Sequence, residues 1–415
     1  MFRPMAGLVA AVLAAVPCQA QAQAVVIRNA RVFDGRQATD HLSVVVQGGL
    51  IRSVGRSVRI PAGAQVVEAE GKTLLPGLID AHVHTAVEGA GALRKALLFG
   101  VTTVLDLFHP VPAELAKLRQ LAVSGVNDVA DLRSAGICAT VPKGHGTEFG
   151  YPIPTIERME GAQGFVDARI AEGSDYIKII HSTKSGVPQT SAELVRALVA
   201  AAHRRNRITL VCIRTAQDAM DAMEAGADGL AHLPQAGELP PDFGRIAARG
   251  GLFVIPTAAV ILPSCRPRFD ASVLADRYLA PFLTPSDVAN LGKAIAPPPS
   301  NVCDNFVREI AQLKAAGVPI LAGTDAPNPA TSYGAGLHGE LRLLNQLGLS
   351  PAESLAAATS LPARVFHLED RGRIEPGKRA DLLLVEGNPL EDIENTRRIA
   401  GIWRNGKRID REALR

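Results

Sequence analysis

Short apolar runs separated by amphipathic stretches repeat along the middle of the chain. The runs lie at residues 78–84, 101–107, 131–138, 176–180, 208–213, 229–233, 252–258 and 319–325. The stretches between them, such as residues 191–205 and 216–225, have helical periodicity, and Gly226 after the second suits a helix C-terminus. This alternation is typical of repeated βα units around a parallel sheet. The pattern predicts an α/β fold in which residues 77–371 form a (β/α)8 TIM-type barrel.

Both ends of the chain show a different, β-rich pattern with glycine-containing turns. Its segments are residues 24–32, 42–54, 64–70, 373–385 and 399–409. We therefore expect residues 25–76 and 372–415 to form one small, composite β-sandwich domain. Residues 260–302, which include three consecutive prolines at 297–299, predict a helical, proline-rich insertion after the seventh strand that forms a lid or wall.

Residues 1–24 have the pattern of a cleaved secretory signal peptide. Arg3 precedes an apolar run at residues 8–16, and small residues in Ala-x-Ala spacing follow up to Ala24. The run is shorter than the about 20 residues that span a bilayer. We expect an exported protein, periplasmic or secreted, without a membrane attachment after cleavage.

The composition argues against nucleic-acid binding and leaves open whether two of the cysteines form a disulfide. Lys and Arg number 44 against 41 Asp and Glu, a net charge of +3, and only 4% of residues are aromatic. Without basic clusters interleaved with aromatics, nucleic-acid binding is not expected. Cys265 and Cys303 flank the predicted insertion, and an oxidising compartment could join them. Spacing alone does not show that their sulfur atoms meet.

Metal-binding residue types follow several of the predicted strands. His82 and His84 end the first run, and residues i and i+2 of a strand project to the same side, so both rings can reach one divalent metal. Lys178, His232 and Asp325 lie at or near the ends of the fourth, sixth and eighth runs. The carboxyl ends of barrel strands meet at one face. The sequence therefore predicts a metal site there.

This order of residues resembles the amidohydrolase superfamily, in particular the metal-dependent hydrolases related to imidazolonepropionase and the Xaa-Pro dipeptidases. The likeness covers nearly the whole chain after the leader, including residues 26–34 and 372–384. It implies two Zn²⁺ ions, the more buried one held by His82, His84 and Asp325 and the second by His232. It also implies that Lys178 is N-carboxylated and bridges the metals, since an ammonium group has no lone pair to offer.

One position departs from the family pattern. Where such proteins usually carry a histidine in a string resembling Val-His-Val-x-Thr, residues 211–215 read Val-Cys-Ile-Arg-Thr. Cys212 could bind zinc as a thiolate, so that the second site persists. Alternatively the second metal is weak or absent and one metal remains, or Cys212 is a small buried hydrophobe beside a one-metal site.

Candidates for substrate contact lie near the same strand ends. Arg214, two residues after Cys212, should point the same way and could bind a carboxylate or pair with an acid. In the loop at residues 143–148, glycines would let the backbone approach a ligand and His145 could hydrogen-bond to it, although a tight loop with a solvated histidine is an equal alternative. Three further histidines follow strands or lie in rim loops: His109, His181 and His338.

The resemblance implies an enzyme that hydrolyses a C–N bond. Its substrate would be an amide, a dipeptide such as Xaa-Pro, an N-acyl amino acid or a cyclic amide, attacked by a metal-activated hydroxide, with Asp325 carrying the proton. A phosphoester or lactone hydrolase on the same site is an alternative. A second alternative is a metal-binding protein without catalytic activity. The presence of Cys212 in place of the usual histidine is the reason for this alternative. The sequence leaves open whether the chain forms a homo-oligomer.

Overall fold

The computed structural model describes residues 24–184, 186–265, 273–293 and 301–415. The predicted signal peptide, apart from Ala24, and the three prolines at 297–299 lie outside the described residues. Within the described part of the chain, no helix is both long and apolar enough to cross a membrane.

Seven of the predicted apolar runs contain strands, arranged in two parallel sheets. The first sheet has the order β6-β7-β8 and the second β12-β11-β10-β9. Their bounds are β6 (Leu78–Val83), β7 (Val101–Asp106), β8 (Asp131–Ser134), β9 (Ile177–Ile180), β10 (Thr209–Cys212), β11 (Gly229–Ala231) and β12 (Phe253–Ile255). The strands are nearly all buried on both faces, as parallel sheets covered by helices require.

The eighth predicted run, residues 319–325, is not a regular strand. It makes isolated parallel bridges instead: Ile320 pairs with Val254 of β12, and Ala326 just beyond it pairs with Val83 of β6. A third bridge, Ala139 to Ile179, links the segment after β8 to β9. Asp325 lies between the bridges of Ile320 and Ala326 and has φ 55°, outside extended geometry, so a regular strand is interrupted there. Bridges rather than continuous ladders therefore connect the edges of the two sheets.

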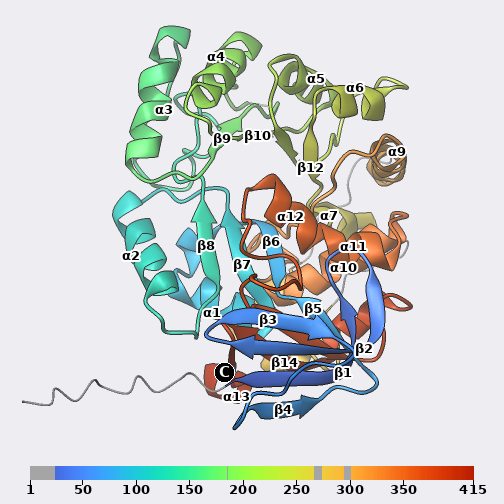
Figure 1. The fold of residues 1–415 in the computed structure, drawn as a ribbon. Coiled ribbons are helices and arrows are strands. Elements are labelled where there is room, and N and C mark those ends of the chain that lie inside the picture. Colours follow the sequence, from blue (N-terminus) through green and yellow to red (C-terminus); the bar gives the residue numbers. More distant parts are fainter. Residues whose placement is uncertain (1–23, 185, 266–272, 294–300) are drawn as a thin grey trace, which may run out of the picture.

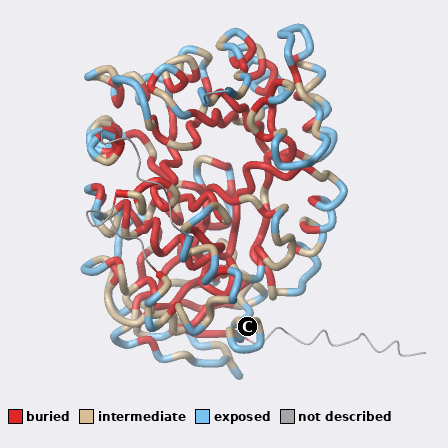
Figure 2. The backbone as a smooth tube through the Cα atoms, turned by 180° about the vertical axis from the view of Figure 1, so that it is seen from behind, coloured by how far each residue is buried: buried red, intermediate tan, exposed pale blue. Residues whose placement is uncertain are grey.

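Helices follow the strands and cover them on the outside (Figure 1). They are α1 (Ala90–Leu98), α2 (Pro112–Val123), α3 (Ala162–Ala171), α4 (Ala192–His203), α5 (Ala216–Glu224), α6 (Phe243–Arg249), α9 (Val302–Ala315), α10 (Ala335–Gln346), α11 (Pro351–Ala357) and α12 (Ser360–Val365). The Ser191 hydroxyl caps α4, and Thr215 with Asp218 forms a capping box on α5. Figure 2 shows the buried residues running through the interior inside this helical cover.

The two chain ends together build the small domain. The strands form one hydrogen-bonded sheet, β15-β14-β13-β5-β1-β2-β3, with β4 also paired to β1. They are β1 (Val25–Phe33), β2 (Ala38–Gln47), β3 (Leu50–Gly55), β4 (Gln65–Glu68), β5 (Lys72–Pro76), β13 (Leu382–Glu386), β14 (Ile399–Arg404) and β15 (Lys407–Arg408). Antiparallel pairing of β5 with β13 joins the two ends. The hydrogen bonds thus connect the strands of both chain ends in one continuous path. That this path folds into a sandwich stays a prediction.

The insertion after β12 contains α7 (Ala258–Ile261) and α8 (Pro285–Leu291), and a disulfide joins Cys265 to Cys303, with Cα atoms 6.1 Å apart. In α8, the Asn290 side chain donates to the backbone oxygens of Pro327, Asn328 and Thr331. The described part of the insertion is therefore fixed to the segment that follows Asp325. Its role as a lid or wall stays a prediction.

Candidate metal centre

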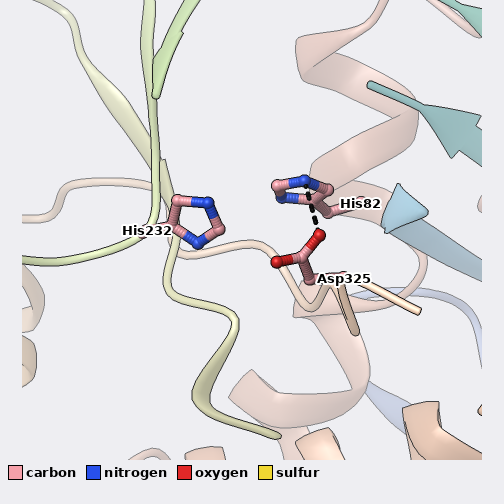
Figure 3. A group of neighbouring side chains, drawn as sticks. All are labelled: His82, His232 and Asp325. Atoms are coloured by element: carbon pink, nitrogen blue, oxygen red, sulfur yellow. Dashed lines mark ion pairs between the residues drawn. The ribbon is translucent and has the colours of Figure 1, made fainter. Parts of the chain in front are cut away.

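Three of the predicted ligands, His82, His232 and Asp325, lie close together at the strand ends (Figure 3). Each offers one ligand atom, and these atoms all lie within 4.8 Å of one another. The Oδ1 atom of Asp325 is 3.1 Å from Nε2 of His82 and 2.8 Å from Nε2 of His84. The structure thus brings four predicted residues, from three distant parts of the sequence, to one place.

A buried carboxylate holds the backbone of this group in place. Asp80 accepts hydrogen bonds from the backbone N–H of His82, at 3.2 Å, and from both the N–H and the hydroxyl of Thr324. Burial raises the pKa of Asp80 to about 7, although these hydrogen bonds oppose the shift. Gly323 completes the contact, since a Cβ there would lie 2.8 Å from the Cβ of His82. The first and last strand ends are therefore locked together.

Two of the candidate ligands have left-handed backbones, with φ 75° at His232 and φ 55° at Asp325. Non-glycine residues rarely adopt this conformation, and it persists only where the surrounding structure enforces it. Such residues gather at functional sites. Here the unusual backbone turns both side chains toward the other ligands.

The hydrogen bonds of His232 define which ring nitrogen carries its proton. Its Nδ1 lies 2.7 Å from the hydroxyl oxygen of Thr257, and that hydroxyl donates its single hydrogen to the backbone oxygen of Pro256. The hydroxyl must therefore accept from Nδ1–H. This leaves the Nε2 lone pair of His232 available for a metal, which is the arrangement expected of a metal-ligating histidine.

The charges in the group favour a bound cation. Burial lowers the pKa of His232 to about 4 and that of His82 well below its usual range, so both rings are neutral near pH 7. Burial works against ionisation of Asp325, but His82 and His84 hold its pKa well below the ordinary value. The buried Nδ1 of His82 has no hydrogen-bond partner among the described residues. Neutral imidazoles around a carboxylate are a donor set that suits Zn²⁺.

Lys178, on β9, is buried at 4% exposure, with its Nζ 3.5 Å from Nε2 of His82. Among the described residues, Lys178 forms no ion pair with an acid, and His82 is the hydrogen-bond partner of its amine. The Lys178 amine lies next to the predicted metal ligands. The resemblance places the carboxylated lysine at this position. The modification itself stays a prediction.

Cys212 lines the same cavity as these ligands but lies outside the group of three whose ligand atoms are within 4.8 Å. Burial raises the pKa of its thiol to about 11, so it is protonated unless a metal binds. Cys138, which is not among the predicted site residues, also lines the cavity. The sequence held a signal, because Cys138 ends the third predicted run. In the structure Ala139 pairs with Ile179, which places Cys138 on the same side as Lys178. Metal binding by Cys212 stays open.

The cavity above the metal group has a volume of about 480 Å³, and His84, Lys178, His232, Asp325 and His145 all contribute to its lining. His145 therefore lies where a substrate contact was predicted, with its Nδ1 bound to Glu148. The loop glycines serve packing as well: a Cβ on Gly146 would come within 3.2 Å of the Cys138 sulfur.

Arg214 does not line the cavity; its side chain is exposed. The expected strand alternation ends too early, because β10 stops at Cys212 and the chain turns into the cap of α5, where the N–H of Arg214 donates to Asp218. The three further histidines are also absent from the lining. His181 pairs with Asp221 and the Thr190 oxygen, and His338 with Thr396 and the Phe99 oxygen, so both have structural partners.

The chain is similar in sequence and in fold to several known proteins. An imidazolonepropionase of Cereibacter sphaeroides is 26% identical over 402 residues, covering 88% of this chain and 93% of that protein. A dihydroorotase of Pelobacter propionicus is 34% identical, but over 128 residues that span only 28% of either chain. The solved structure of a Xaa-Pro dipeptidase with bound methionine has the same fold, with a TM-score of 0.75 at 22% identity, covering 94% of this chain and all of that one.

The sequence profile of the amidohydrolase family matches residues 73–409, which include every candidate ligand. Members of this family generally bind a metal, as the resemblance implied. The chain belongs to the amidohydrolase family.

Proposed function

We propose that this protein is a metal-dependent hydrolase that cleaves a C–N bond. The observation that carries the proposal is the convergence of His82, His232 and Asp325, with ligand atoms within 4.8 Å of one another, at the base of a cavity large enough for a small molecule. Amides, dipeptides such as Xaa-Pro, N-acyl amino acids and cyclic amides are the candidate substrates. The imidazolonepropionase and Xaa-Pro dipeptidase likenesses support this range.

For the fold, we propose that the two parallel sheets and the segment at residues 319–326 are one (β/α)8 barrel. The support is the set of backbone hydrogen bonds across each gap. Ala139 donates to the oxygen of Lys178, Leu321 to that of Val254, and Asp325 to that of His82. Placing the ligands at strand ends then agrees with the usual site of catalysis in such barrels.

The residues present fit a divalent cation. His82, His84 and Asp325 would hold one Zn²⁺, and His232, a carboxylated Lys178 and Cys212 are the groups available for a second. When bound, the metal supplies a Lewis acid that polarises the scissile carbonyl and lowers the pKa of water. Lys178 without carboxylation would contribute no lone pair.

Asp325 is the residue we assign to proton transfer. Its carboxylate is ionised in the folded protein and lines the cavity. In the hydrolysis, the oxygen of water bonds to the acyl carbon, the C–N bond breaks, and Asp325 takes a proton from the water and passes it to the leaving nitrogen. His84, at 2.8 Å, orients the carboxylate.

Hydrolysis of matched substrates tests this proposal. The purified chain would be incubated with an amide, and with a phosphoester and a lactone of similar size, before and after treatment with a chelator. We expect release of an amine from the amide, loss of that activity on chelation, and no activity in Asp325→Asn. Phosphate or hydroxy-acid release without amine would favour the alternative reaction. No turnover with retained metal would indicate a binding protein.

We also propose that the protein is exported, to the periplasm or outside the cell. The disulfide between Cys265 and Cys303 supports an oxidising compartment, where such bonds persist. N-terminal sequencing of the protein recovered from the producing cell would test this, with a first residue close to Val25 as the expected result.

A further inference from the structure

The mouth of the cavity is apolar. In the described chain, nine large hydrophobic side chains are exposed, and three of them, Val87, Phe149 and Tyr151, line this cavity. Phe149 is 54% exposed and Tyr151 38%, and they are the two aromatic residues in that set. Exposed apolar groups gathered at one opening mark a binding surface.

These side chains continue inward to the metal group. The ring of His84 lies 6.4 Å from that of Phe108, and the Phe108 ring lies 6.1 Å from that of Phe149. These centroid separations are within the range of edge-to-face aromatic contacts. A substrate ring bound close to His84 would therefore meet Phe108, and a larger group would reach Phe149.

Away from the metal group, the described lining offers no cationic side chain that could pair with a substrate carboxylate. It contains no arginine, and its only lysine is Lys178 at the metal group. His145 is occupied by Glu148, whose carboxylate also accepts from the N–H of Gly146 and places negative charge near the mouth. One N–H of the Asn328 side-chain amide donates to the backbone oxygen of Asp325. An unpaired buried charge is costly, so this lining disfavours an anionic substrate.

The loop at residues 140–156, which includes Phe149 and Tyr151 of the cavity mouth, is held in place by its own hydrogen bonds. The Thr140 hydroxyl donates to the His145 oxygen and the Thr147 hydroxyl to the Gly144 oxygen, both at 2.8 Å. The N–H of Ile156 donates to Thr140 at 2.9 Å, beyond Phe149. An apolar surface held in place before binding loses little conformational entropy when a ligand covers it.

We propose that the substrate carries a neutral aromatic group beside its scissile C–N bond, and that Phe108 and Phe149 are specificity-determining residues that bind this group. This inference rests on the proposed hydrolase function. It favours uncharged aryl amides over dipeptides and N-acyl amino acids with a free carboxylate. Burial of the substrate ring against Phe108 and Phe149 provides the affinity, and the lack of an arginine or a second lysine in the described lining provides the discrimination.

Two amides that differ by one carboxylate separate the possibilities. Benzanilide is neutral, 4-benzamidobenzoate has the same skeleton with one negative charge, and N-methylacetamide lacks the rings. With the metal-loaded full chain, we expect kcat/KM for benzanilide to exceed that of the other two by about tenfold or more. A preference for 4-benzamidobenzoate, or equal rates for all three, would overturn the inference while leaving the hydrolase function intact.

Phe149 is the position to vary, because it is half-exposed and its loss should not unfold the chain. We expect Phe149→Ala to lower kcat/KM for benzanilide by roughly five- to tenfold, mainly through KM, and Phe149→Leu by less than about threefold. Met159→Ala, at an exposed apolar residue outside the cavity, is the matched control. An unchanged kcat/KM in Phe149→Ala would contradict the assignment.

If none of the three amides is hydrolysed, the inference can still be tested by measuring how tightly the compounds bind. Saturation-transfer NMR on the same protein would compare benzanilide with 4-benzamidobenzoate. Tighter binding of benzanilide that is weakened by Phe149→Ala would support the ligand class while the proposed reaction fails. Equal binding of the two compounds, or tighter binding of the charged one, would overturn the ligand class as well.

Discussion

The hydroxyl oxygen of Thr257 lies 2.7 Å from Nδ1 of His232, across 25 residues of sequence. Thr257 has a left-handed backbone, φ 51°, which is rare for a β-branched residue. Glu340 holds the next turn by accepting from the N–H groups of Ala258 and Ala259. The fold thus maintains an unfavourable backbone at the position that orients a candidate ligand.

We predict that Thr257→Val lowers metal affinity by roughly 10- to 100-fold, because the valine cannot accept the Nδ1–H hydrogen bond that fixes the His232 tautomer. Thr257→Ser keeps the hydroxyl and should remain within a few-fold of the native affinity. Titration with Zn²⁺ against a chelating indicator would measure both. Equal affinities in the two variants would remove Thr257 from the metal centre.

Metal content per chain should decide the role of Cys212. If its thiolate is a ligand, elemental analysis of the purified protein should find about two metals natively and about one in Cys212→Ala. Cys138→Ala is a suitable control, since Cys138 is another buried thiol of the same cavity. One metal in the native protein and in both variants would assign Cys212 to packing and leave a mononuclear site.

Loss of the disulfide should destabilise the insertion. The bond closes a segment of 38 residues, and the chain-entropy argument gives about 3–4 kcal/mol for a loop of that length. We therefore expect the Cys265→Ser, Cys303→Ser double variant to unfold at lower denaturant concentration, and the native protein to match it when reduced. Denaturant curves with and without a reductant would show this. A reductant effect that persists in the double variant would point to another cause.

Stability should fall with rising pH because of Glu309 on α9. Both of its carboxylate oxygens are buried without a hydrogen-bond partner in the described structure, and burial raises its pKa from 4.5 to about 8. Between these values the unfolded chain releases the proton while the folded chain keeps it, so the free energy of unfolding decreases as pH rises through this window.

Glu309→Gln cannot ionise, so its free energy of unfolding should depend less on pH between about 5 and 8 than that of the native chain. Denaturant unfolding at several pH values would measure the two slopes. Glu157→Gln, at an exposed residue, should keep the native slope. A Glu309→Gln slope equal to the native one would mean that the buried carboxyl does not control this range.

Local patterns were enough to place most of the metal group. Strand periodicity puts His82 and His84 at one strand end, and the shared edge of parallel strands predicts that His232 and Asp325 meet them. Both inferences depend on backbone geometry and on the burial of hydrophobic residues. The order of residues along the chain determines both. The β-rich chain ends could likewise be predicted, because the alternation of hydrophobic and polar residues shows which segments form strands.

Only the tertiary structure decided how those segments meet. The sequence pattern did not reveal that residues 319–325 make isolated bridges, that Arg214 does not line the cavity, or that Thr257 orients His232. It also missed the apolar mouth formed by Val87, Phe149 and Tyr151. Each of these depends on backbone turns and on contacts between residues distant in sequence, whose energies come from packing rather than from local preference. A periodic pattern fixes the face on which a side chain lies, but not the partner it meets there.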